Sequence, residues 1–412
     1  MGCGDLSCYG GTSVPTPNMD RLAKEGTRFT QFYVASPVCS PSRTGFLTGM
    51  YPARWRITSY LQSRAGNRAC GQNDFLDPKA PSIARVLKEA GYATAHIGKW
   101  HMGGGRDVTN APPFRDYGFD EHAGTYESPE PDSSITATNW IWSPEDKIKR
   151  WDRSGYFVDK TLDFLQRHKG QPCYVNLWPD DVHAPWIPEG AANKRGSPDF
   201  SHAQLKCVIK EYDRQVGRLL DGLRELGLEK NTLLVFTSDN GPLPTFDDAR
   251  TVGMRGSKIS LYEGGTCMPL IVRWPGRTPA GRVDEKTVMN AVDFFPMFCR
   301  VAGVDLPKGI KFDGEDLIEA FFGKSIVREN AMLWEYGRNN TSFDYPKVVR
   351  DRSPNVAIRE GKWKLLVNAD ASGAELYDLK MDREEKTNLA EKNPIVAKRL
   401  SEKALAWRKS LP

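Results

Sequence analysis

Short apolar runs alternate with amphipathic segments along most of this chain, and the alternation predicts strands that alternate with helices. The predicted strands are short apolar runs bounded by turn residues, at 92–97, 173–178 and 232–237. The predicted helices carry apolar residues at helical spacing, at 16–26, 82–91, 156–168 and 203–226. Pro17 at the start of the first helix and Gly26 at its end are typical helix boundaries.

The pattern changes after about residue 325. Short apolar strands separated by turns follow, at 331–336, 356–359, 363–367 and 375–379, and a final helix covers 394–405. Close strands with tight turns predict a small antiparallel sheet packed by one helix. We therefore expect two domains, a large one at 1–325 and a small one at 326–412.

The larger segment favours an α/β fold with a mostly parallel central sheet and helices on both faces. Ligands of such sheets bind at the carboxyl ends of the strands. Four polar residues follow predicted strands, namely His101, His183, Asp239 and Asn240. We expect them to lie along one edge of the sheet.

Composition narrows the range of functions. A chain of 412 residues with 39% hydrophobic residues can bury a sizeable core. The net charge is +5, and basic residues are interspersed with acidic ones, so no nucleic-acid partner is expected. No apolar run has the length of a membrane span, so no membrane partner is expected either. The eight cysteines lack paired spacing, which predicts neither a disulfide framework nor a zinc site.

The segment Cys39-Ser40-Pro41-Ser42-Arg43 is the most informative one, because it puts a possible nucleophile beside a fixed cation. Backbone N–H groups at a helix N-terminus favour anions, and the arginine adds a planar charged fork. The segment resembles the signature of type I, formylglycine-dependent sulfatases of the alkaline phosphatase superfamily. In that family the cysteine is oxidised to formylglycine, whose hydrated aldehyde attacks sulfur. The resemblance implies this role for Cys39, against the alternative of an ordinary buried cysteine.

Further segments along nearly the whole chain resemble the same family. They are the helix at 16–26, the run Gly98-Lys99-Trp100-His101, and the C-terminal Gly-Lys-Trp-Lys-Leu and Leu-Tyr-Asp-Leu patterns. Lys99 and His101 lie two apart on a segment expected to be extended, so both side chains should face one way. The resemblance implies that Lys99 binds sulfate and that His101 orients or protonates the geminal diol. The alternative is a surface lysine beside a structural histidine.

Two later residues complete the expected catalytic set. His183 resembles the family histidine near the leaving-group oxygen, where an imidazole suits general acid catalysis. Lys258 lies in a glycine-rich segment that resembles the one carrying the second sulfate-binding lysine. Arg43 would offset negative charge near the modified side chain. A loop histidine that caps a turn and a solvated loop cation are the alternatives for His183 and Lys258.

The prediction of a metal site rests on the family resemblance and on the oxygen donors present. Asp239 and Asn240 follow a predicted strand, and the resemblance implies that they bind Ca²⁺ together with the formylglycine oxygen of residue 39. They are also common turn residues. Related chains begin with a buried strand ending in two aspartates, whereas this sequence starts at the following turn with Met1-Gly2-Cys3-Gly4-Asp5. Losing two carboxylates should weaken a site that needs about six to eight oxygen ligands.

We therefore expect a truncated or misassigned start. A signal peptide is not present in the printed chain. A periplasmic or secreted location is expected if the true N-terminus is longer.

The expected function is calcium-assisted hydrolysis of a sulfate ester, of a small molecule or of a sulfated oligosaccharide, through formylglycine at position 39. The resemblance also implies a formylglycine-generating or anaerobic maturation enzyme as a partner. Two alternatives stay open: a phosphoester hydrolase of the same superfamily, since a fold does not fix a function, and a catalytically impaired binder of sulfated glycans. Loop residues that could line a sugar pocket are Arg54, Trp55, Arg56, Arg106, Trp140 and Trp142.

Overall fold

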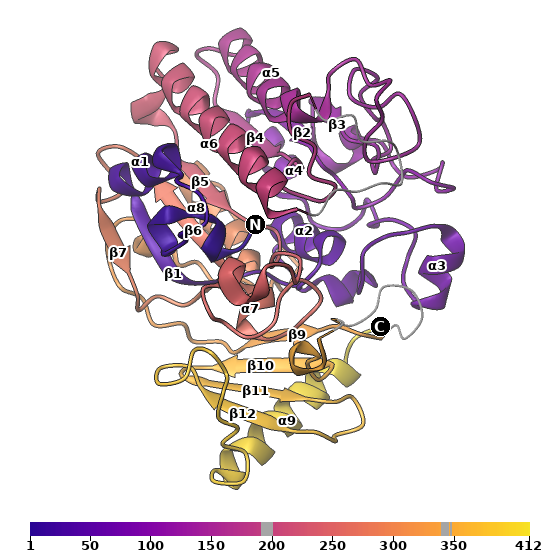
Figure 1. Ribbon diagram of the computed structural model, residues 1–412, viewed down its shortest axis with the longest axis vertical. Helices are drawn as coiled ribbons and strands as arrows, with labels where there is room; N and C mark the ends of the chain where they lie inside the picture. Colours follow the sequence, from indigo (N-terminus) through magenta and orange to yellow (C-terminus); the bar gives the residue numbers. More distant parts are fainter. Residues whose placement is uncertain (191–200, 339–345, 347) are drawn as a thin grey trace.

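The computed structural model describes residues 1–190, 201–338, 346 and 348–412, and it shows a large α/β domain above a small sheet domain (Figure 1). One sheet of the large domain contains β5 (Leu234–Thr237), β6 (Cys267–Arg273), β1 (Thr27–Tyr33) and β7 (Arg282–Asp284) in that order, with β8 (Met289–Asn290) paired to β1. A second sheet contains β3 (Glu121–Gly124), β2 (Ala93–Gly98) and β4 (Cys173–Trp178).

Helices cover both faces of these sheets. On one face, α1 (Pro17–Glu25) and α6 (His202–Glu225) pack on β5 and β6, and α5 (Arg153–Arg167) packs on β2 and β4. On the other face, α8 (Phe294–Ala302) packs on β1 and β6, and α4 (Ile83–Glu89) packs beside it. The large domain also contains the α-helices α2 (Cys39–Thr48), α3 (Arg64–Ala69) and α7 (Glu263–Thr266). Among the described residues, none of the helices combines the length and apolarity that a membrane crossing requires.

The α/β fold class is confirmed, with two differences in detail. Strand β2 runs parallel to β3 and β4, and β1 runs parallel to β7 and β8, but β6 is antiparallel to both β1 and β5. The sequence pattern did not predict β6, whose seven residues are all buried. The run 173–178 forms β4 as predicted, although five of its six residues are only half-buried.

The small antiparallel sheet and its single helix are confirmed. It contains β9 (Met332–Glu335), β10 (Val356–Glu360), β11 (Trp363–Val367) and β12 (Glu375–Asp378), packed by α9 (Pro394–Lys409). Alternate residues of β10 face opposite ways, as the period of a strand requires. Val356 and Ile358 pack on α9, whereas Ala357 packs toward the large domain. The boundary after residue 325 stays a prediction.

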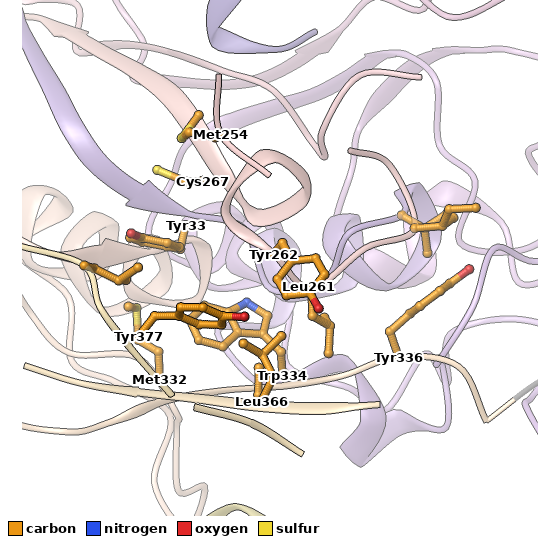
Figure 2. Packing of buried hydrophobic residues seen from close by; sticks show 14 of the residues in the cluster. Tyr33, Met254, Leu261, Tyr262, Cys267, Met332, Trp334, Tyr336, Leu366 and Tyr377 are labelled. Carbon is orange, nitrogen blue, oxygen red and sulfur yellow. The ribbon is translucent and has the colours of Figure 1, made fainter. Parts of the chain in front are cut away.

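Aromatic residues fill the space between the two domains. Figure 2 shows Tyr262, Trp334 and Tyr377 gathered there, with Tyr33 and Cys267 on the side of the large domain. Trp334 is almost fully buried and donates from its indole N–H to the backbone carbonyl of Val34 at 2.7 Å. Large aromatic side chains of this kind bury much apolar surface and satisfy their polar atom at the same time.

A buried ion cluster crosses the same interface. The ammonium of Lys364 lies 2.9 Å from Glu263 and 3.0 Å from Glu385, and all three side chains are 0% exposed. The hydroxyl of Tyr33 donates to Glu263 at 2.6 Å. One cation therefore holds two carboxylates from different segments of the chain, and the carboxylates depend on it because isolated buried charges are costly.

Replacing Lys364 with methionine should destabilise the protein by about 3–5 kcal/mol, because two buried carboxylates lose their cation. Urea unfolding followed by circular dichroism measures this change. Lys362→Met is the matched control, since Lys362 pairs with Asp378 with about half of its side chain exposed and should cost at most about 1 kcal/mol. Equal losses in the two variants would contradict the role of the buried cluster.

Candidate active site

The carboxyl ends of three strands meet at one place, and Arg43 of α2 connects two of them. Its guanidinium donates to the backbone carbonyl of Lys99, just after β2, at 2.6 Å, and to the carboxylate of Asp239, just after β5, at 2.7 and 3.0 Å. The ring of Trp178, at the end of β4, lies under the same guanidinium. The strand ends therefore lie close together, but in the described residues β5 belongs to a different sheet from β2 and β4, and one buried arginine connects them.

Cys39 is the first residue of α2, and its side chain is buried beside His101. The sulfur lies 3.1 Å from Nδ1 of His101. Burial alone would raise the pKa of this thiol, but the nearby charges of His101 and Lys99, with the hydrogen bond from His101, lower it to about 6. A thiol at a helix N-terminus beside cations is the environment in which a cysteine becomes reactive.

Glu127 is a residue of the site that the sequence did not indicate. Its carboxylate lies 3.2 Å from the ammonium of Lys99, 3.2 Å from Nδ1 of His101 and 2.9 Å from Arg106. Burial would raise the pKa of Glu127, but these cations lower it to about 2. Glu127 follows β3, a strand that was not predicted, so the rule of strand ends could not be applied to it.

The backbone leaves the extended conformation at His101, which corrects the expected extended segment. Strand β2 ends at Gly98, whose φ is 113°, and an added Cβ there would lie 2.2 Å from the carbonyl oxygen of Trp178. His101 itself has a φ of 55°, which is uncommon for a residue with a side chain. Both side chains nevertheless converge, because each reaches the carboxylate of Glu127.

His183 and Lys258 form a second pair. Lys258 donates from its ammonium to Nε2 of His183 at 3.1 Å, while Nδ1 of His183 lies 2.7 Å from the backbone carbonyl of Ala184. A carbonyl only accepts, so Nδ1 carries the proton and Nε2 accepts from Lys258. Burial and the charge of Lys258 place the pKa of His183 well below its ordinary value, and burial also lowers the pKa of Lys258.

The C-terminal domain anchors the loop that carries Lys258. Arg255 donates to the hydroxyl of Tyr377 at 2.9 Å, and the amide of Leu261 donates to Ser353 at 2.9 Å. Ile259 has a φ of 67°, which is strained for a β-branched residue. The surrounding contacts therefore fix a loop conformation that the local sequence would not adopt alone.

The predicted metal ligands are close together but are few. Asp239 is held by Arg43, and Asn240 donates to the carbonyl of Gly241 at 2.8 Å. The described part of the chain contains no group of three or more His, Cys, Asp or Glu side chains able to hold a metal ion. A calcium ion takes about six to eight oxygen ligands, so the donor set in these residues does not fit one.

The candidate sugar-contacting residues divide into different environments. Arg106 contacts Glu127 and the carbonyl of Leu61, and it lies over the ring of Tyr126, so it borders the site. Trp142 is buried and therefore cannot stack on a ligand without rearrangement. Arg54 forms an ion pair with Asp313, at 2.7 Å.

Comparison with known proteins gives matches over the whole chain. The family model described as sulfatase matches residues 1–304, and the model described as the C-terminal part of N-sulphoglucosamine sulphohydrolase matches residues 257–409. An N-acetylgalactosamine-6-O-sulfatase of Bacteroides thetaiotaomicron is 30% identical over 98% of this chain and 90% of its own length. The N-acetylgalactosamine-6-sulfatase of the dog is 32% identical over 79% of this chain and 65% of its own length.

Solved structures agree with these matches. A sulfatase structure from a study of glycosaminoglycan metabolism by Bacteroides thetaiotaomicron has a TM-score of 0.75 and 27% identity, covering 97% of this chain and 95% of that one. The structure of Ps i-CgsB in complex with k-i-k-neocarrahexaose has a TM-score of 0.75 and 25% identity, covering 99% and 90% of the two chains. The phosphonate monoester hydrolase of Agrobacterium radiobacter, at 21% identity and a TM-score of 0.69, shares the fold.

The thiol of unmodified Cys39 should titrate near pH 6, so thiolate should be present above that pH. The difference in absorbance at 240 nm between the wild-type protein and Cys39→Ala, followed from pH 4 to pH 10, measures this titration. His101→Gln should move the midpoint upward, because the largest contribution that lowers the pKa is removed. Cys299→Ala is the control and should leave the titration unchanged, since burial raises the pKa of Cys299 to about 11. A midpoint above pH 8 in the wild-type protein would contradict the assignment.

Proposed function

The chain belongs to the sulfatase family, whose members hydrolyse sulfate esters, and from this we propose that it cleaves sulfate esters of carbohydrates with Cys39 as the precursor of its nucleophile. The observation that carries the proposal is the position of Cys39. It is the first residue of a helix, its sulfur is 3.1 Å from His101, and Arg43 and Lys99 lie at the same strand ends. A nucleophile surrounded by fixed cations suits attack on an anionic ester.

The family uses a formylglycine and a metal ion. We infer that Cys39 is the residue converted here, by a formylglycine-generating or anaerobic maturation enzyme. Cys39 is buried beside His101 at a helix N-terminus. This environment suits a formylglycine that the protein must hold in place and supply with a proton. The formylglycine supplies the hydrated aldehyde that attacks sulfur.

The chain's own residues bind the sulfate and move protons. Arg43, Lys99 and Lys258 present positive charge where negative charge accumulates on the sulfuryl oxygens, and one such preorganised donor is worth about 2.7–4 kcal/mol. His101 contacts position 39 directly and is placed to orient it or to protonate it. Glu127 holds Lys99 and His101 in position.

The pair of Lys258 and His183 is placed to protonate the leaving oxygen. Nε2 of His183 accepts from the ammonium of Lys258, so the proton available at this point belongs to Lys258. The lowered pKa of Lys258 makes it a stronger acid than an exposed lysine. General acid catalysis therefore involves both side chains, rather than a cationic His183 alone.

Asp239, Asn240 and residue 39 are the positions that the family resemblance assigned to calcium, and they do not fit that ion in this chain. The described residues provide too few oxygen donors for it, and Arg43 occupies the carboxylate of Asp239. We therefore assign no catalytic step to a metal ion in this chain.

Sulfated sugars are the proposed substrate class, and 6-O-sulfated N-acetylgalactosamine is the first to test. The support is that the relative from Bacteroides thetaiotaomicron, named as an N-acetylgalactosamine-6-O-sulfatase, aligns with 98% of this chain. Arg106 borders the site and offers a planar cation that could contact a sugar hydroxyl or a carboxylate.

Cys39→Ala should abolish sulfate release while the fold persists, because the nucleophile is lost. Sulfate release is measured from a panel of sulfated sugars, one aryl sulfate and one phosphate monoester, with and without calcium. Cys299→Ala, a buried cysteine outside the site, should retain the wild-type rate. Turnover by Cys39→Ala would remove Cys39 from its role. Preferred cleavage of the phosphate ester would favour a phosphoester hydrolase, and sugar binding without turnover would favour an impaired glycan binder.

Glu127→Gln should lower kcat by about 10²-fold with a smaller change in KM, because a small displacement of Lys99 and His101 costs transition-state stabilisation. Steady-state kinetics on the best substrate of the panel measures both constants. Glu130→Gln is the matched control in the same loop, since Glu130 is half-exposed and should change kcat by no more than about twofold. A wild-type kcat for Glu127→Gln would contradict a positioning role, and Glu127→Asp should recover part of the activity.

A further inference from the structure

The loop that carries His183 is held at its backbone by one buried arginine, Arg150. Its Nη2 atom donates to the carbonyl of Asp180 at 2.6 Å and to the carbonyl of His183 at 2.9 Å. Its Nη1 atom donates to the carboxylate of Asp180 at 2.7 Å. Arg150 is only 1% exposed, so these charge-assisted bonds form away from solvent. One planar guanidinium therefore closes the loop between the two residues and fixes the point from which the His183 side chain extends.

The other carbonyls of this loop also accept hydrogen bonds. Val182 accepts from the indole N–H of Trp186 at 3.0 Å. Ala184 accepts from Nδ1 of His183 at 2.7 Å, which leaves Nε2 of the same ring to face the ammonium of Lys258. The direction of the ring thus depends on the local backbone. A shift of that backbone would move Nε2 away from Lys258.

Arg150 comes from a segment that lies about 30 residues before the loop. It begins a short helical turn, Arg150–Asp152, that leads into α5, and α5 packs on β4 in the upper part of the large domain (Figure 1). Strand β4 ends at Trp178, and the loop of His183 follows it. The packing of α5 on β4 therefore brings the arginine and the loop together.

A second buried arginine, Arg153, connects the same loop to the segment that precedes α5. Its guanidinium lies 3.2 Å from the carboxylate of Asp180 and 3.2 Å from that of Asp146. It also donates to two backbone carbonyls at 135–141, at 3.0 and 3.1 Å. The hydrogen bonds described for Arg153 do not include the carbonyl of His183. The two arginines share one carboxylate but hold different parts of the backbone.

Arg150 also acts on His183 through its charge. Burial is the main cause that places the pKa of His183 well below its ordinary value, and the charges of Lys258 and Lys99 add to it. The charge of Arg150 acts in the same direction. A neutral imidazole is the form whose Nε2 can accept from an ammonium group. Arg150 therefore supports both the position and the uncharged form of His183.

We propose that Arg150 is a positioning residue of the active site, which holds the backbone of the His183 loop so that His183 and Lys258 together protonate the leaving oxygen. Arg150 acts only through His183 and does not contact the substrate. This inference rests on the proposed function, because it assigns Arg150 a part in the departure of the alcohol. Its loss should therefore affect poor leaving groups more than good ones.

The test compares two sulfate esters with different leaving groups. A sugar alkoxide is strongly basic and needs a proton to leave, whereas 4-nitrophenolate leaves readily without one. Arg150→Met should lower kcat for a 6-O-sulfated sugar by at least about tenfold, and kcat for 4-nitrophenyl sulfate by no more than about threefold. KM should change little for either ester, because Arg150 does not bind the sulfate. Steady-state kinetics measures both constants.

Two further variants separate this role from a general loss of stability. Arg273→Met is the matched control, since Arg273 is 2% exposed, pairs with Glu25 and Glu229, and lies at the end of β6. It removes a comparable buried cation and should leave the ratio of the two kcat values unchanged. Arg150→Lys keeps the charge without the planar set of donors, so it should recover part of the activity on the sugar sulfate. Circular dichroism checks that each variant is folded.

Hydrogen exchange tests the same geometry without turnover. The amide of His183 donates to the carbonyl of Asp180 at 3.0 Å, so its exchange reports on opening of the loop. Arg150→Met should speed exchange in the peptide that contains His183 by at least about tenfold, because the loop opens more easily. Arg150→Lys should speed it less, and Arg273→Met should leave it unchanged.

Three results would overturn the proposal. They are equal losses of kcat on the two esters in Arg150→Met, a wild-type kcat of this variant on the sugar sulfate, and unchanged exchange near His183. If Arg150→Met does not fold, Arg150→Lys decides by the same comparisons. If the wild-type chain hydrolyses neither ester, the proposed function fails. The exchange result alone then decides whether Arg150 holds the loop.

Discussion

The carboxylate of Glu127 is the group on which the geometry around Cys39 depends. Lys99, His101 and Arg106 all contact it, and Glu127 itself is only 4% exposed. Several cations in one buried place repel each other and lose their hydration, so they stay there only with a countercharge at hydrogen-bonding distance. Glu127 supplies that charge at 2.9–3.2 Å from the three side chains.

Arg43 fixes the position of the helix that carries Cys39 relative to the strands. It extends from α2, the helix that begins with Cys39, to the ends of β2 and β5. The position of the nucleophile is thereby fixed relative to two strand ends through one planar side chain. A lysine could not make these contacts together, because it lacks the rigid set of donors that a guanidinium has.

The small C-terminal domain contributes to the site without contacting Cys39. It holds the loop of Lys258 through Tyr377 and Ser353, and it holds Glu263, at the start of α7, through Lys364. The strained φ of Ile259 persists because these contacts outweigh it. The position of Lys258 beside His183 therefore rests on packing between the two domains.

Much of the fold follows from local pattern. The helices at 16–26, 82–91, 156–168 and 203–226, the strands β2, β4 and β5, and all four C-terminal strands lie where the apolar periodicity predicted them. Strand β6 was not predicted, although all seven of its residues are buried. Its antiparallel direction is a property of its neighbours, which no local pattern records.

The sequence by itself determined the chemistry: a cysteine followed by an arginine, two lysines, two histidines, and an Asp-Asn pair after a strand, in segments that resemble one family. Only the tertiary structure decided which of these groups pair with each other and which of them carry a proton. Glu127 became the shared counterion, the backbone at His101 left the extended conformation, and Lys258 rather than His183 carries the proton between them. The physical reason is that charge, burial and pKa depend on distances between residues far apart in the chain, which the order of residues does not specify.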